Sequence, residues 1–462
     1  MERPVLPDEV RAALPPIAQD YIAWLESRGR KHSQNSSLPP SKDPLDAPTR
    51  PVQERSGRLR GGQPGHPGHH RMMVAPDVVV DHYPAACPGC QRLLGETCAD
   101  AAEPRRQQVW DLPPPPRPVV TEHRYHTVAC PDCGTSITAD RPVGVPDGAF
   151  GPEVTALVGL LHGRYRLSAR EIVALLDDLW RMPIGLGSVP ELWRSVGDAL
   201  AEPYAEAHAA VAASPRLNVD ETRWNQAGAT RWLWTAVGAV STVFIVAATR
   251  AKIVLVDLIG PSYGGIVGSD RYYAYKSIPV TQRQACWAHI KRNLAEVAGW
   301  GGPCGAWGNE ALAEVAHLFG AWHRFRDGTT DRLGLQADLK PIQIAFDTLL
   351  HRGESDLPST KAQGLCADLL SLWPALWTFS TTDGIEPTNN AAEHAIRPAV
   401  LWRKGCFGAD SDDGNLFVER ILTVIATCRQ QQRALLPFLS ATVRAHVARL
   451  PPPPLIQAPV PA

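Results

Sequence analysis

The sequence predicts an α/β protein in which helices cover a mixed β-sheet, preceded by an extended N-terminal third. Strand-like and helical runs follow one another in the order β-β-β-α-β after residue 213, and three antiparallel strands with a crossover to a fourth make a mixed sheet. Prolines mark the extended third, since 23 of the 43 lie in residues 1–150. Tryptophans mark the packed part, since 12 of the 14 follow residue 150.

Length and charge limit the class of protein. The chain has 462 residues, about three domains of ordinary size, and its hydrophobic share of 44% is enough for at least one sizeable core. Its 46 Lys and Arg residues balance 47 Asp and Glu residues. The net charge of −1 excludes a wholly basic, histone-like protein but leaves room for a local basic patch.

Residues 1–75 are predicted to hold a short helix over 8–30 and then a disordered basic arm. Residues 31–71 are rich in Ser, Pro, Gly and Arg and show no period. Five arginines stand against one glutamate in residues 50–71, so the arm can follow DNA phosphates, with Arg55, Arg58 and Arg60 as contacts. A merely solvated linker would have the same composition.

Two Cys-x-x-Cys pairs predict a zinc-ribbon-like domain over residues 76–148. Cys87 with Cys90, and Cys130 with Cys133, can supply the four thiolates that close the tetrahedral shell of a structural Zn²⁺ ion. The alternative is a redox dithiol, which normally has a single pair beside a βαβ unit. Cys98 is unpaired, so it is not assigned as a ligand.

Residues 149–212 are predicted to form a helical, helix-turn-helix-like DNA-binding segment. Apolar spacing continues from Pro152 to Trp180, and a second helix follows a turn at 183–187, with Ser188 as its N-cap. Two short helices around a Gly-containing turn are typical of a helix-turn-helix. Any small helical bundle gives the same pattern.

Residues 213–445 are predicted to form the α/β core, with residues 289–385 as a helical insertion. Strands are expected at 217–224, 231–237, 242–249, 265–270 and 283–287, and a helix at 251–259. The uncharged run 232–249 just reaches the length of a membrane span, but Gly238–Thr242 splits it into two runs typical of paired buried strands. Residues 446–462 are predicted to be a disordered Pro-rich tail.

Carboxylates at two strand ends predict a metal site. Asp220 and Asp270 each end a predicted strand, so both emerge at one sheet edge if these strands are neighbours. Two such carboxylates repel each other unless a hard divalent cation lies between them, and Mg²⁺ or Mn²⁺ suits their oxygens. A third carboxylate, Glu393, follows a cap at Asn389 or Asn390 and lies in the first turns of a helix. Ordinary strand ends and a capped surface helix give the same pattern.

Several motifs, taken together and in order, resemble those of transposases of the insertion sequence 66 family. They are NSSLPPSKD at 35–43, GGQPGHPGHH at 61–70, the two Cys-x-x-Cys pairs, NVDET at 218–222, GSDRYYAY at 268–275, QACWAHIKRNL at 284–294 and NNAAEHAIRPAVLWRKGCFGADSDDG at 389–414. The resemblance implies a ribonuclease H-like catalytic core with an Asp-Asp-Glu triad, carried here by Asp220, Asp270 and Glu393. The family's pattern is altered at Arg271 and His394, which concerns activity level and DNA contacts rather than class.

The resemblance implies a DNA transposase that cuts strands at transposon ends and transfers them into target DNA, using Mg²⁺ or Mn²⁺ at the triad. The implied partners are transposon-end and target DNA, further copies of the chain on that DNA, and accessory proteins of the element, but no membrane. DNA contacts are predicted at the basic side chains around the triad, for which a solvated face is the alternative: His289, Lys291, Arg292, Arg397, Arg403 and Lys404. The first residues lack the apolar segment of a secretory signal, so the expected location is the cytoplasm, on the nucleoid.

Two other functions fit the same residues. One is a catalytically inactive or domesticated zinc-ribbon protein that only binds DNA. The other is a ribonuclease H-like nuclease that cuts without strand transfer. A Mg²⁺-dependent nicking assay tests the first alternative, and a strand-joining assay tests the second.

Overall fold

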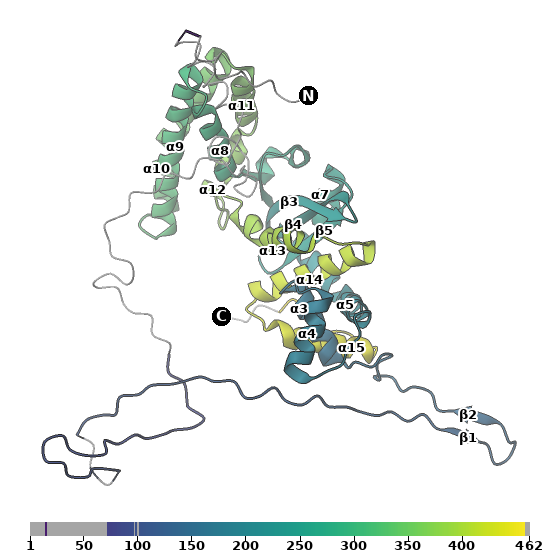
Figure 1. The fold of residues 1–462 in the computed structure, drawn as a ribbon. Coiled ribbons are helices and arrows are strands. Elements are labelled where there is room, and N and C mark those ends of the chain that lie inside the picture. The colour runs from purple at the N-terminus through teal and green to yellow at the C-terminus, as the bar shows by residue number, and fades with distance from the viewer. Residues whose placement is uncertain (1–13, 16–71, 97, 99–100, 458–462) are drawn as a thin grey trace. The chain divides into compact units, whose positions relative to one another are not determined.

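The computed structural model describes residues 14–15, 72–96, 98 and 101–457 (Figure 1). The predicted N-terminal helix and the basic arm, with Arg55, Arg58 and Arg60, lie outside the described residues. The chain divides into two compact units, Thr49–Val119 and the remainder, and each is described by itself. Among the described helices, none combines the length and the hydropathy of a membrane span.

Within the unit Thr49–Val119, the described residues form an extended chain with one tight turn. The backbone of Val74 bonds to the side-chain amide of Gln108 at 3.1 and 2.6 Å. Ala86 pairs with Leu93 in an antiparallel bridge that encloses the first Cys-x-x-Cys pair. Large apolar side chains such as Leu112 stay exposed, so no hydrophobic core holds the described part of this unit.

From residue 120 on, the other unit contains a short hairpin followed by a group of helices. The hairpin is β1 (Thr127–Ala129) and β2 (Ser136–Thr138), and the helices are α3 (Pro152–Gly163), α4 (Ala169–Trp180), α5 (Ser188–Ala199) and α6 (Ala201–Ala212). The helical run expected to reach Trp180 is interrupted because Ser168 and Glu171 form a capping box that begins α4. Ser188 was predicted as an N-cap, but it is the first helical residue and Gly187 holds the cap position.

The predicted helix-turn-helix-like segment shares the core of the α/β unit. α3 and α5 pack against α14 (Asp412–Gln430) and α15 (Leu435–Val447), and Leu160 and Val196 belong to the same buried cluster as the sheet. The exposed positions of α5 are Glu191, Arg194 and Asp198. Because their net charge is negative, α5 lacks the basic face that a DNA-reading helix needs.

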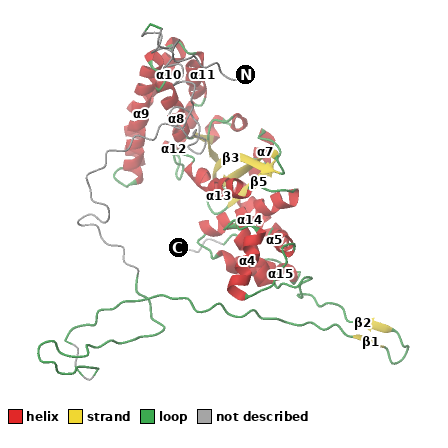
Figure 2. Cartoon of the chain, viewed as in Figure 1, coloured by secondary structure: helices red, strands yellow, loops and turns green. Residues whose placement is uncertain are grey.

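The predicted mixed sheet is present. Among the described residues, five strands join in the order β5-β4-β3-β6-β7. Figure 2 shows strands of this sheet, such as β3 and β5, in yellow among the red helices. They are β3 (Arg216–Gln226), β4 (Ala229–Val237), β5 (Thr242–Ala247), β6 (Ile266–Ser269) and β7 (Arg283–Ala285). The first three are antiparallel, whereas β6 runs parallel to β3 and β7 runs parallel to β6. α7 (Lys252–Ile259) makes the crossover to β6, and the uncharged run 232–249 forms most of β4 and all of β5.

Helices close both edges of the sheet through side-chain hydrogen bonds. Three amides of β5 donate to side chains one turn apart on α14: Val246 to Glu419 at 2.7 Å, Phe244 to Thr423 at 3.1 Å, and Thr242 to Thr427 at 3.1 Å. The acceptors are four residues apart on α14 and the donors two residues apart on β5. These distances along the two elements match, because four helical residues advance about 6 Å and two strand residues about 6.6 Å. On β7, the Thr378 hydroxyl donates to the Arg283 carbonyl at 2.6 Å. These three β5 amides and the Arg283 carbonyl are therefore not free to pair with a further strand.

The predicted helical insertion has a core of its own. It comprises α8 (Trp287–Ala298), α9 (Gly302–Arg326), α10 (Arg332–Asp356), α11 (Thr360–Ser371) and α12 (Trp373–Thr381). Trp307, Phe346 and Trp377 are buried in it. Figure 1 shows α9 and α10 extending away from the sheet, and α12 packs on β7. α13 (Asn390–Cys406) then returns the chain to the sheet.

The segment after α15 differs from the expected disordered tail over 446–462. The chain packs as far as Gln457, and residues 458–462 lie outside the described part. Leu455 is buried, and the amides of Leu455 and Ile456 donate to the Glu206 carboxylate at 2.6 and 3.1 Å. Prolines have no amide hydrogen to donate, so the residues that follow the proline run make this contact.

Candidate active site

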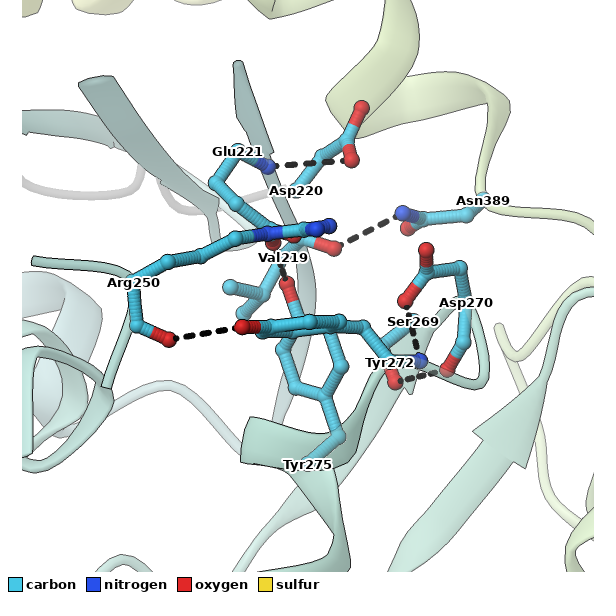
Figure 3. Close-up of polar contacts among 9 residues, drawn as sticks. All are labelled: Val219, Asp220, Glu221, Arg250, Ser269, Asp270, Tyr272, Tyr275 and Asn389. Carbon is cyan, nitrogen blue, oxygen red and sulfur yellow. Dashed lines mark hydrogen bonds and ion pairs between the residues drawn. The ribbon is translucent and has the colours of Figure 1, made fainter. Parts of the chain in front are cut away.

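β3 and β6 bring the two predicted aspartates to one place. The parallel register pairs Asn218 with Gly268, so Asp220 comes level with Asp270 two residues further on. Asp270 follows β6 directly, as predicted, whereas Asp220 lies inside β3, which continues to Gln226. Both carboxylates lie beside Asn389 (Figure 3).

The third predicted carboxylate, Glu393, lies in the first turn of α13. Its Oε1 is 3.5 Å from Nδ1 of His289 and 3.4 Å from Nη2 of Arg292, both of which lie on α8. Burial, and then the charge of Arg292, lowers the pKa of His289. Arg292 is therefore the cation that faces Glu393 at neutral pH.

Asp220 has no cationic partner among the described residues. Its Oδ1 accepts the backbone amide of Glu221 at 3.0 Å. Burial, and then the charges of Glu221, Asp270 and Glu393, hold the pKa of Asp220 well above its usual range. A carboxylate whose negative charge is opposed in this way gains most from a divalent cation.

Asn389 holds α13 against β3, a role that sequence reasoning missed. It occupies the N-cap position of α13, as predicted, but its side chain makes no cap bond. Instead Nδ2 donates to the Val219 carbonyl at 2.8 Å, and Oδ1 accepts from Asn218 at 2.9 Å. The side chain is buried, and Figure 3 shows its bond to Val219, the neighbour of Asp220 in β3. Because Asn389 directly precedes α13, these bonds fix the start of the helix that carries Glu393 against β3. The pair Asn389–Asn390 before Glu393 was the one sequence feature that could have indicated this role.

Glu221 points to the opposite face of β3, as strand alternation predicts, and its carboxylate is paired. Nε of Arg250 donates to it at 2.7 Å, and the Tyr275 hydroxyl donates to its other oxygen. Burial, and then the Asp270 charge, raises the pKa of Glu221, while Tyr275 and Arg250 oppose the rise. The Arg250 guanidinium also lies 3.4 Å from the ring centre of Tyr272.

The contacts among Glu221, Arg250, Tyr272 and Tyr275 connect to both aspartates. Glu221 adjoins Asp220 in the chain, and the Tyr272 amide donates to Oδ1 of Asp270 at 2.8 Å (Figure 3). Behind it, Arg271 pairs with Asp368 on α11 and donates to Asn293 on α8 at 2.9 Å. The loop that carries Asp270 is thus tied to both the sheet and the insertion.

The predicted DNA-contacting side chains on α8 and α13 divide into three groups, of which the first, His289 and Arg292, faces Glu393. Lys291, Arg397 and Lys404 are exposed. Arg397 and Lys404 lie on the face of α13 that carries Glu393, because steps of four and eleven residues are close to whole turns. Arg403 instead donates to the Arg223 carbonyl and to the Thr222 hydroxyl at 3.1 Å, so it is engaged with β3.

Each predicted zinc-binding pair forms the same tight turn within its own unit. In each turn, the amide of the first cysteine donates to the carbonyl five residues later, which belongs to Arg92 or Thr135. The amide four residues later, of Gln91 or Gly134, donates to the carbonyl of that first cysteine. All four distances are 2.9 Å. The turn needs a positive φ at that fourth position, where Gln91 has 60° and Gly134 has 72°. The amide of Cys90 lowers the pKa of Cys87, and Thr135 lowers that of Cys133. Both turns therefore favour the thiolate form that binds metal.

Three regions of the chain match models of known protein families. Residues 148–416 match the model of the IS66 family of transposases, and residues 84–134 match a zinc-finger binding domain of transposase IS66. The second match supports a structural zinc ion. Residues 6–72 match a family of unknown function, DUF6444.

Two curated proteins of Sinorhizobium fredii (strain NBRC 101917 / NGR234) are similar to parts of the chain. The uncharacterized protein y4qI is 25% identical over 196 residues, which is 39% of this chain and 36% of the relative. The uncharacterized protein y4hP is 28% identical over 187 residues, which is 36% of this chain and 34% of the relative. The chain thus spans about a third of the length of the curated relatives it matches.

Proposed function

The chain belongs to the IS66 family of transposases, and from that premise we propose that it cuts DNA at the ends of a mobile element and joins the cut strands to target DNA. The proposed catalytic residues are Asp220, Asp270 and Glu393. The observation that carries the proposal is the meeting of these carboxylates beside β3, β6 and α13, with Asp220 lacking any cationic partner among the described residues.

The donor set fits Mg²⁺ or Mn²⁺ at these carboxylates. Their oxygens are hard ligands, and the raised pKa of Asp220 reflects negative charge that the described side chains leave uncompensated. When bound, such ions polarise phosphate oxygens and lower the pKa of coordinated water. Asn389 and Tyr272 would keep the carboxylates in place, because each bonds directly to the strand or loop that carries an aspartate.

The proposed reaction is two successive displacements at phosphorus. Water attacks a phosphodiester at the element's end, and the departing oxygen becomes a free 3′-hydroxyl. That hydroxyl then attacks a target phosphodiester, whose own 3′ oxygen leaves. Each bond broken is matched by one formed, so no covalent link to the protein is needed. Arg292, Arg397 and Lys404 lie on the Glu393 side and would hold the phosphates.

The sheet order supports the further proposal of a ribonuclease H-like core. Three antiparallel strands are followed, through α7, by two strands parallel to β3. The zinc-finger match spans all four cysteines of the two pairs, which supports Cys87, Cys90, Cys130 and Cys133 as the ligands of the structural Zn²⁺. DNA, further copies of this chain and accessory proteins are the proposed partners.

The experiment combines nicking and joining on the DNA that flanks the gene. Full-length protein with Mg²⁺ is expected to give both nicked and joined products, and Asp270→Asn to give neither while still shifting end DNA in a gel. The exposed Asp257→Asn on α7 is the matched control and is expected to behave as wild type. Nicking without joining would indicate a nuclease, and end binding without nicking a DNA-binding protein only.

A further inference from the structure

Two side chains beside Glu393 form a ligand set that the proposed cutting reaction does not use. Cys286 holds the N-cap position of α8, and His289 lies in the first turn of that helix. Ligand atoms of Cys286, His289 and Glu393 all lie within 4.8 Å of one another. We propose that these three residues bind a borderline-soft divalent metal ion of the Zn²⁺ class, at a site separate from the four-cysteine zinc site.

The spacing of the nitrogen and oxygen ligands fits one shared ion. Nδ1 of His289 and Oε1 of Glu393 are 3.5 Å apart. Ligands of one tetrahedral zinc ion, with bonds of about 2.0–2.3 Å, lie about 3.3–3.6 Å from each other. Nδ1 is buried and has no hydrogen-bond partner among the described residues. A metal ion would give this nitrogen the partner that buried polar atoms normally have.

The start of α8 supplies hydrogen-bond donors to the sulfur of Cys286. Its side chain is buried, and its Sγ accepts the Asn389 amide at 3.2 Å. Burial raises the pKa of the Cys286 thiol, and the backbone amides of Asn389, His289 and Ala288 oppose the rise. Donors of this kind stabilise the charge that remains when the thiol releases its proton to solvent on metal binding.

The chemistry of the ligand set selects the class of metal. A thiolate and an imidazole favour Zn²⁺ and its transition-metal neighbours over Mg²⁺ and Ca²⁺. The charged groups near the site are two carboxylates, Asp270 and Glu393, and two guanidinium groups, Arg271 and Arg292. Three protein ligands leave a fourth position open to water or a phosphate oxygen.

The site has one consequence that rests on the proposed function. Glu393 would serve both this site and the Asp220–Asp270 site. Zn²⁺ bound by Cys286 and His289 would draw the Glu393 carboxylate away from the two aspartates. Micromolar zinc would then slow DNA cutting in Mg²⁺, and the ion would act as an inhibitor.

The decisive test counts zinc ions on the full-length protein without DNA. Titration against a chromogenic chelator is expected to find two zinc ions per wild-type chain and one in Cys286→Ala and His289→Ala, with affinity at the second site lowered by at least about 100-fold. Cys428→Ala removes an equally buried thiol on α14 and is expected to keep both ions. Thermal melting with one zinc ion bound verifies that each variant is folded. Equal zinc counts in wild type and Cys286→Ala would overturn the proposal.

A second arm separates this proposal from the proposed function. Each protein's cutting rate in Mg²⁺ is compared with its own zinc-free rate. Zinc is expected to inhibit the wild type at concentrations that leave Cys286→Ala uninhibited, and equal sensitivity would overturn the inhibitory role. If no protein cuts DNA, the proposed function fails while the zinc count still decides the site.

Discussion

Asp220 and Glu221 are adjacent on β3 and meet opposite conditions on its two faces. Glu221 is fully buried and paired with Arg250 and Tyr275. Asp220 accepts only an amide among the described residues and is surrounded by further carboxylates. The comparison teaches that one face of β3 supplies a cation and a hydroxyl to its buried carboxylate, whereas among the described residues the other face supplies neither. The clustering of further carboxylates around the unpaired Asp220 is what supports the proposed metal site there.

The largest expected effect comes from the unpaired face. Asp220→Asn keeps the size of the side chain and removes the charge, so Mg²⁺-dependent nicking should fall by about 1000-fold. The same change should raise the free energy of unfolding, because it relieves repulsion with Asp270 and Glu393. Nicking rates and urea denaturation measure the two effects. Loss of stability together with activity would contradict the comparison.

The paired face should respond in the opposite sense. Arg250→Met leaves the buried Glu221 carboxylate without its counter-charge and should lower the free energy of unfolding at neutral pH by about 2–3 kcal/mol, at the low end of the range because Arg250 is 28% exposed. Adding Glu221→Gln should recover part of the loss. Urea denaturation of the single and double variants checks this. A neutral single variant would mean that the pair contributes nothing.

A third buried carboxylate, Glu419, sharpens the comparison through pH. It accepts the Val246 amide but lacks an ion pair among the described residues, and burial raises its pKa from 4.5 to about 7. The folded state therefore holds the proton more tightly than the unfolded state. Protonated Glu419 therefore adds to the free energy of unfolding. This addition is complete below about pH 4.5 and is lost as the pH rises through 7.

Glu419→Gln keeps an acceptor for the Val246 amide and cannot ionise. Its free energy of unfolding should match the wild type near pH 4 and exceed it by about 2–3 kcal/mol at pH 8. Urea denaturation across this pH range measures the difference. A constant difference at all pH values would show that Glu419 does not titrate between the two states.

The smallest expected effect concerns the link between β3 and α13. Asn389→Ala removes bonds to Asn218 and Val219, which should cost about 1–2 kcal/mol of stability and lower the nicking rate about 10-fold at saturating DNA. The exposed neighbour Asn390→Ala is the matched control and should leave both unchanged. Weaker DNA binding with an unchanged maximal rate would indicate a different role for Asn389.

Local sequence patterns predicted the strands and the meeting of Asp220 with Asp270. Apolar runs bounded by turn residues such as Gly238 mark strands without knowledge of the rest of the fold. The partners of Asn389 lie about 170 residues away, so no local pattern reports them. Glu221 could be assigned to the opposite face by alternation, but its pairing with Arg250 depends on where α7 begins. The burial of Leu455 likewise depends on Glu206 and not on the proline run.

The bonds that close β5 impose an order on synthesis. Their α14 partners lie 173–185 residues further along the chain. At about 5–20 residues per second, a ribosome reaches them roughly 10–40 s after it completes the strand. During that interval a nascent sheet carries a bare edge, open to pairing with a neighbouring nascent chain on the same messenger. Translation speed between β5 and α14 therefore bears on the yield of soluble protein, independently of the stability of the finished molecule.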